Sequence, residues 1–173
     1  MKSDYKNPFG KFNGNEADYV LRALDSETPE NKNFPWVQKF EEAFRDRVGS
    51  KYAIAVNSGT SGLHAALYAA GVEAGDEVIQ PATTVVMDAY VTLHLGAVPV
   101  FVDICPKSWN IDHTKIEEKI TKKTKAIIVV SLYGLPVDID PILEIASRYN
   151  LIVIDDSAET LMTKYKNRYA GTH

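Results

Sequence analysis

Five short apolar runs that alternate with helix-like segments constrain the fold of this chain more than any other feature. Each run is apolar over nearly its whole length, which is typical of strands buried on both faces of a parallel sheet. Helical segments between successive runs are the connections that parallel strands require. The runs span residues 52–56, 76–80, 98–104, 125–134 and 151–155. The pattern predicts an α/β fold with a mostly parallel sheet.

Segments with helical spacing of apolar residues precede and separate these runs. The predicted helices span residues 16–27, 36–49, 61–71, 85–96, 113–120 and 140–150. A stretch rich in helix-breaking residues, 28–35, is predicted to be a loop. We therefore expect residues 1–50 to form an N-terminal helical segment and residues 51–173 to form the sheet-containing domain.

Composition excludes several classes of protein. Acidic residues outnumber basic ones, 23 to 19, and no basic patch is present, which argues against a nucleic-acid partner. The N-terminus has no apolar signal region, and no stretch approaches the length of a membrane span, so we expect no membrane association. The single cysteine, Cys105, cannot form an internal disulfide, and a reducing, cytoplasmic location is expected.

Polar clusters follow the predicted strands where each strand ends. They are "NSGTSG" after the first run, "PATT" after the second, Asp103 at the end of the third, "SLYG" at the end of the fourth, and Asp155 with Asp156 at the end of the fifth. Because the carboxyl ends of parallel strands meet at one edge of a sheet, these clusters should gather there. In open α/β sheets this edge is where ligands bind.

The segment "NSGTSG" has the character of a phosphate cradle. Gly59 allows close approach of the backbone, the following helix offers free N–H groups, and Thr60 and Ser61 add hydroxyls. The alternative is a tight turn with a helix N-cap. The segment is neither a dinucleotide-binding G-x-G-x-x-G motif nor a P-loop.

Asp156 lies directly after the last predicted strand, and three roles are open for it. It could partner a protonated ring nitrogen, ligate magnesium beside Asp155 and Asp103, or cap the following turn. Asp155 should point to the opposite face because side chains alternate along a strand. The histidines have no zinc-site spacing, and we expect no metal.

Four segments in this order resemble the DegT/DnrJ/EryC1/StrS group of pyridoxal-phosphate (PLP) aminotransferases. They are "FEEAFRDRVGSKYAIAVNSGTSGLHAAL", "LGAVPVFVDICPKSWNID", "TKAIIVVSLYGLPVDIDPI" and "LIVIDDSAET". The resemblance covers nearly all 173 residues. It implies the aspartate aminotransferase-like (type I PLP) fold, here as an incomplete large domain.

The resemblance also implies roles for individual residues. Gly59, Thr60 and Ser61 match the phosphate-binding turn, and Asp156 matches the acid that pairs with the pyridine nitrogen of PLP. Glu159 stands where the family usually has glutamine or histidine near the phenolic oxygen. A glutamate there should be protonated, bonded elsewhere or turned away. Val85 stands where the family usually stacks an aromatic ring on the cofactor, and would give apolar contact without stacking.

No catalytic residue is assigned within this chain. By resemblance the Schiff-base lysine lies beyond His173, and Lys164 and Lys166 come too early in the sequence to match it. The C-terminal small domain is likewise expected to be absent. We therefore expect the 173-residue chain by itself to be inactive.

The function implied by the resemblance is transfer of an amino group to a nucleotide-linked keto-sugar. Glutamate is the expected amino-acid donor, and a homodimer is the expected assembly. Three alternatives stay open: a PLP-dependent sugar dehydratase with histidine in place of the lysine, a non-catalytic truncated relative, and a phospho-acceptor receiver domain. In receiver domains the paired acids normally come early in the chain, whereas here they come last.

Overall fold

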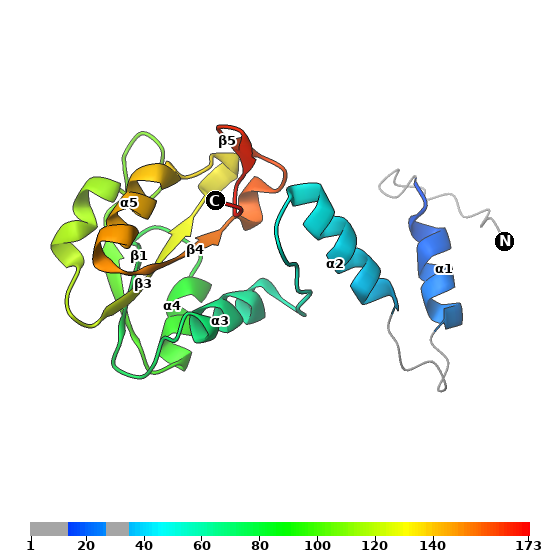
Figure 1. Cartoon of the computed structure of the whole chain (residues 1–173), viewed down its shortest axis with the longest axis horizontal. Coiled ribbons are helices and arrows are strands. Elements are labelled where there is room, and N and C mark those ends of the chain that lie inside the picture. The colour runs from blue at the N-terminus through cyan, green and yellow to red at the C-terminus, as the bar shows by residue number, and fades with distance from the viewer. Residues whose placement is uncertain (1–13, 27–34) are drawn as a thin grey trace. The chain divides into compact units, whose positions relative to one another are not determined.

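The computed structural model describes residues 14–26 and 35–173 (Figure 1). They belong to two compact units, of which the first ends at Ala55 and the second begins at Val56. The predicted loop over residues 28–35 lies, apart from its last residue, outside the described residues.

The described residues of the first unit form two helices, α1 (Glu16–Ser26) and α2 (Pro35–Val48), close to the predicted ranges. Gly49 ends α2 with a positive φ of 74°, a conformation that glycine adopts without steric cost. The indole Nε1 of Trp36 donates to the Ser26 hydroxyl at 2.9 Å, which ties the start of α2 to the end of α1.

The predicted strand over residues 52–56 is wrong. This segment pairs with no strand in the part of the chain that the structure describes. The Ala55 N–H donates instead to the Glu41 carboxylate at 2.8 Å, and Ile54 is 81% exposed. An apolar run becomes a strand only when a neighbouring strand takes up its backbone hydrogen bonds, which the sequence pattern does not reveal.

The second unit contains the predicted parallel sheet, and the other four strands are confirmed. They are β1 (Glu77–Pro81), β2 (Val98–Val102), β3 (Thr124–Val130) and β4 (Ile152–Asp156). Their spatial order is β2-β1-β3-β4, and every neighbouring pair is parallel. The chain leaves β1 for β2 on one side and returns to β3 on the other. The order therefore reverses at β1, which is the point where open α/β sheets bind ligands.

Three helices cover the two faces of this sheet (Figure 1): α3 (Gly59–Ala69), α4 (Met87–His94) and α5 (Ile139–Tyr149). Residues of β3 alternate between two core clusters. Ile127 packs in the cluster that contains Ile142 of α5, and Ile128 packs in the cluster that contains Leu67 of α3 and Val91 of α4. Two covered faces explain why residues 126–130 of this strand are all apolar.

The remaining elements are short. They are the 3₁₀ turns η1 (His113–Lys115), η2 (Glu117–Lys119), η3 (Leu132–Gly134) and η4 (Ala158–Thr160) and the antiparallel strands β5 (Lys164–Tyr165) and β6 (Arg168–Tyr169). The helix predicted over residues 113–120 is therefore two 3₁₀ turns. The Lys115 N–H donates to the Asp112 carbonyl three residues earlier, which is the 3₁₀ pattern.

Candidate functional site

The N-terminus of α3 lies at the carboxyl edge of the sheet. The helix runs antiparallel to the strands, because Gly71, just past its C-terminus, lies beside the Lys125 side chain near the start of β3. The N–H groups of Gly59 and Thr60 have no acceptor among the described residues, as expected for the first turn of a helix. Unpaired N–H groups at the positive end of a helix dipole are a favourable environment for an anion.

The third amide of the predicted cradle is already used. Ser58 is the N-cap of α3, and its hydroxyl accepts from the Ser61 N–H at 3.1 Å. The Ser61 hydroxyl donates to Asn57 Oδ1 at 2.7 Å. The structure thus shows the N-cap that was the alternative to a cradle, and the N–H groups of Gly59 and Thr60 stay without an acceptor among the described residues. A Cβ on Gly59 would meet no atom within 4 Å, so the space in front of the turn is open.

A hollow of about 570 Å³ adjoins this turn on the surface of α3 and α4. It is lined by Ser58, Thr60, Ser61, His64, Ala65, Tyr68 and His94. The His64 and His94 rings lie 6.4 Å apart, centroid to centroid. Its size is that of a small-molecule site, and it borders the turn that carries the free amides.

Asp156 ends β4 on the face that α3 and α4 cover. Ile154, two residues earlier, packs against the core cluster of that face, and side chains two apart along a strand share a face. Asp156 Oδ1 accepts from the Ala158 N–H at 3.1 Å, which turns the chain after the strand. Asp155 faces the opposite side, as predicted, and accepts from the Ser157 hydroxyl at 2.7 Å and the Gly171 N–H at 2.8 Å. Asp155 is therefore a structural residue.

Glu159 is exposed on η4, and its carboxylate is bonded elsewhere. Oε2 accepts from the backbone N–H of Tyr133 at 2.6 Å. Tyr133 has a left-handed φ of 52° and lies in η3, directly after β3. Three outcomes were expected for a glutamate at this position: protonated, bonded elsewhere or turned away. The structure shows it bonded elsewhere, because the carboxylate holds the turn after the neighbouring strand β3.

Replacing Glu159 by alanine should free the Tyr133 amide. We expect hydrogen exchange at that amide to accelerate about tenfold, since the net value of such a hydrogen bond is about 1 to 1.5 kcal/mol. Glu159→Gln is the matched control, because its amide oxygen can still accept. Equal exchange rates in wild type and Glu159→Ala would show that the bond does not hold the turn.

Val85 lies between β1 and α4 with 42% of its surface exposed, so its methyl groups are available for apolar contact. Its carbonyl accepts from the Asp88 N–H at 3.4 Å, which begins the first turn of α4. Val85, Asp156 and the free amides of α3 come from three different segments at the carboxyl edge.

Two buried polar residues at this edge were missed by the sequence analysis. Asp88 in the first turn of α4 and Gln80 in β1 both have no exposed surface. Asp88 precedes Val91 and Thr92 by three and four residues, so the three side chains share one face of the helix. This spacing could have predicted that Asp88 is buried. Gln80 interrupts an apolar strand, which was a second signal.

The side-chain nitrogens of Lys164 and Lys166 both contact other residues. Lys166 pairs with Asp140, which raises the pKa of its ammonium group. Lys164 Nζ lies 4.8 Å from the centroid of the Tyr169 ring. Both lysines belong to the β5–β6 hairpin.

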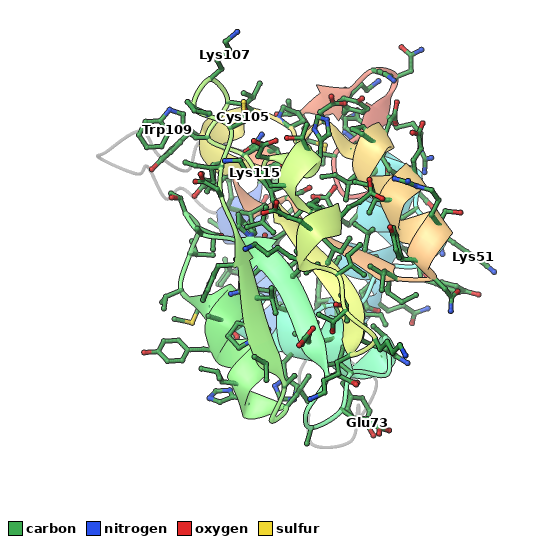
Figure 2. All side chains as sticks on the ribbon, turned by 90° about the vertical axis from the view of Figure 1, so that its left-hand side faces the viewer. Lys51, Glu73, Cys105, Lys107, Trp109 and Lys115 are labelled. Carbon is green, nitrogen blue, oxygen red and sulfur yellow. The ribbon has the colours of Figure 1, made fainter. Side chains whose placement is uncertain are left out.

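Within residues 14–26 and 35–173, no three His, Cys, Asp or Glu side chains gather in an arrangement that could hold a metal ion. Asp103 accepts from Lys115 Nζ at 2.8 Å. Figure 2 shows Lys115 near Cys105, which follows β2.

Among the described helices, none combines the length and apolar character needed to cross a membrane.

The fold defines a class of protein: an α/β domain with a parallel sheet, a helix N-terminus and a strand-end carboxylate at one edge, as in type I PLP enzymes. The chain belongs to the DegT/DnrJ/EryC1/StrS aminotransferase family, whose sequence profile matches residues 11–173. The predicted family and fold class are both confirmed.

Curated relatives include sugar aminotransferases. The chain is 46% identical to GDP-perosamine synthase of Caulobacter vibrioides over 162 residues, which cover 94% of the chain and 43% of that protein. It is 46% identical over 134 residues to UDP-2-acetamido-2-deoxy-3-oxo-D-glucuronate aminotransferase of Pseudomonas aeruginosa, covering 78% and 37%. The chain thus spans less than half the length of these relatives.

Solved structures show the same fold. An aminotransferase from Psychrobacter cryohalolentis is 38% identical, with a TM-score of 0.86, over 94% of this chain and 41% of that one. GDP-4-keto-6-deoxy-D-mannose-3-dehydratase of E. coli, solved with bound hydrated PLP, is 30% identical, with a TM-score of 0.83, over 93% and 42%.

Proposed function

We propose that the protein is a PLP-dependent aminotransferase that acts on a nucleotide-linked keto-sugar, with glutamate as the amino donor. The observation that carries this proposal is the 46% identity to a GDP-perosamine synthase over 94% of the chain. A second sugar aminotransferase at the same identity supports the same substrate class.

The residues at the carboxyl edge fit PLP. The free N–H groups of Gly59 and Thr60 suit a phosphate, and the open space at Gly59 lets that phosphate approach. The carboxylate of Asp156 suits a protonated ring nitrogen, and the half-exposed Val85 suits the ring face. When bound, PLP supplies an electron sink for the substrate carbon.

Each residue then has a physical task. The amides of Gly59 and Thr60 fix one end of the cofactor by binding its phosphate. Asp156 holds a proton at the pyridine nitrogen, because a negative charge beside that nitrogen favours its protonated form. Glu159 holds the Tyr133 turn beside the site and so limits its motion. Holding the cofactor and substrate in a fixed orientation can lower the activation free energy of a reaction by several kcal/mol.

The runner-up is a sugar dehydratase of the same family. It has specific support, because the dehydratase of E. coli shares the fold at 30% identity. GDP-perosamine synthase of Caulobacter vibrioides and the Pseudomonas aeruginosa aminotransferase are more similar, at 46% identity each. This difference in identity favours amino transfer.

The test is to incubate the protein from the complete reading frame with ¹⁵N-glutamate, PLP and either GDP-4-keto-6-deoxymannose or a UDP-linked keto-sugar. Amino transfer predicts a sugar product that carries ¹⁵N. A dehydratase would give a deoxygenated sugar without ¹⁵N, and no sugar product at all would indicate a non-catalytic relative. Light scattering of the same preparation tests the proposed homodimer.

A further inference from the structure

Asp88 is a buried acid for which the proposed function gives no role. It lies in the first turn of α4 with no exposed surface. Its Oδ2 accepts from the Thr84 hydroxyl at 2.6 Å, while Oδ1 has no hydrogen-bond partner in the described part of the chain. An ionised carboxylate with one bare oxygen is costly in a protein interior, so burial favours the protonated acid.

Asp88 and Asp156 share one face of the sheet. Val91, one turn after Asp88, belongs to the core cluster between the sheet and helices α3 and α4, and Ile154 packs against that cluster. Asp156 follows Ile154 by two residues and so has the same orientation. Burial raises the pKa of Asp88 to about 6, the Thr84 hydroxyl lowers it, and the negative charge of Asp156 raises it further. The two carboxyl groups therefore share one face of the sheet, and the charge of Asp156 acts on that of Asp88.

Gln80 adds a second unsatisfied polar side chain to this face. By strand alternation it points the same way as Val78, which belongs to the α3–α4 cluster. Neither its Nε2 nor its Oε1 has a partner among the described residues, although the side chain is fully buried. A buried carboxyl and a buried amide with unused hydrogen-bonding capacity thus lie under the edge that carries Asp156. Core packing alone does not require them.

We propose that Asp88 is a positioning residue that acts through Asp156. By holding or releasing a proton, Asp88 sets the total negative charge that the two carboxyl groups present to the pyridine nitrogen. With Asp88 protonated, Asp156 carries the charge alone. With Asp88 ionised, a second negative charge strengthens the hold on the ring proton. This inference rests on the proposed function, in which Asp156 faces the pyridine nitrogen.

Other titratable groups around α4 are few. The helix carries Tyr90 and His94, whose rings stack 6.5 Å apart, and α3 carries His64 and Tyr68. Strand β2 carries no titratable side chain. In β1, Glu77 lies at the amino end, where it accepts from the Thr121 hydroxyl at 2.5 Å. The charge that raises the pKa of Asp88 is that of Asp156.

The test is a ¹³C carboxyl NMR titration of the cofactor-free protein from the complete reading frame. The Asp88 midpoint should lie near pH 6 in wild type. Asp156→Asn should lower it by about 0.5, because it removes a like charge. Thr84→Val should move it the opposite way, since it removes the hydroxyl that favours the ionised form. Asp103→Asn, a strand-end acid paired with Lys115, is the control and should leave the midpoint unchanged.

A midpoint near 4, or one that Asp156→Asn does not move, would overturn the inference. A second arm compares PLP affinity. If Asp156→Asn weakens PLP binding but does not move the Asp88 midpoint, the inference fails and the proposed function stands. If the midpoint moves but Asp156→Asn binds PLP as wild type does, the proposed function fails, and with it the role given to the pair. With both effects present, Asp88→Asn should lower the pH at which bound PLP loses its ring proton.

Discussion

Replacing Asp156 with asparagine should lower the rate of amino transfer by about 100-fold or more while leaving the fold intact. The substitution keeps the size of the side chain and an oxygen that can accept from the Ala158 N–H, so the turn after β4 should persist. It removes the negative charge that favours a proton on the pyridine nitrogen. Loss of one preorganised electrostatic partner typically costs about 10²–10³ in rate.

The neighbouring acid provides a matched control for this experiment. Asp155→Asn makes the same chemical change on the opposite face, where the carboxylate accepts from Ser157 and the Gly171 N–H. It should lower thermal stability rather than the rate per molecule of bound PLP. Steady-state kinetics and thermal melts of both variants separate the two effects. Near-normal turnover in Asp156→Asn would rule out its assigned role.

Replacing Gly59 with aspartate should weaken PLP binding by about 100-fold. The new carboxylate would stand at the helix terminus where we place the phosphate. Two like charges about 4 Å apart repel by about 4 kcal/mol at an effective dielectric constant of 20, and solvent exposure reduces this value. The substitution should be tolerated by the fold, since a Cβ at this position meets no atom within 4 Å.

Gly59→Asn separates charge from size in this second experiment. It has nearly the same volume as the aspartate variant and carries no charge, so the difference between the two reports phosphate repulsion. Fluorescence titration with PLP gives both dissociation constants. If the aspartate and asparagine variants bind PLP equally, the phosphate does not lie at the start of α3.

The sheet was predictable because its strands are covered on both faces. Residues 126–130 contribute to both core clusters, and a segment buried on both faces must be apolar at every position. The opposite orientations of Asp155 and Asp156 followed from the same alternation. The carboxyl-edge location of the candidate site followed in turn from the parallel order of the strands.

Other features depend on tertiary contacts that a linear pattern does not contain. Residues 52–56 have the composition of a strand, but the Ala55 N–H donates to a side chain of α2. The contact between Glu159 and the Tyr133 amide joins residues that are 26 positions apart. The burial of Asp88 depends on how α4 packs, and its coupling to Asp156 depends on the arrangement of the sheet.

The most direct test of the central claim is a crystal structure of the protein from the complete reading frame with pyridoxamine 5′-phosphate. The account predicts phosphate oxygens within hydrogen-bonding distance of the Gly59 and Thr60 N–H groups, and the pyridine nitrogen against the Asp156 carboxylate. A phosphate bound at another helix terminus, or a ring nitrogen that faces a group other than Asp156, would contradict it.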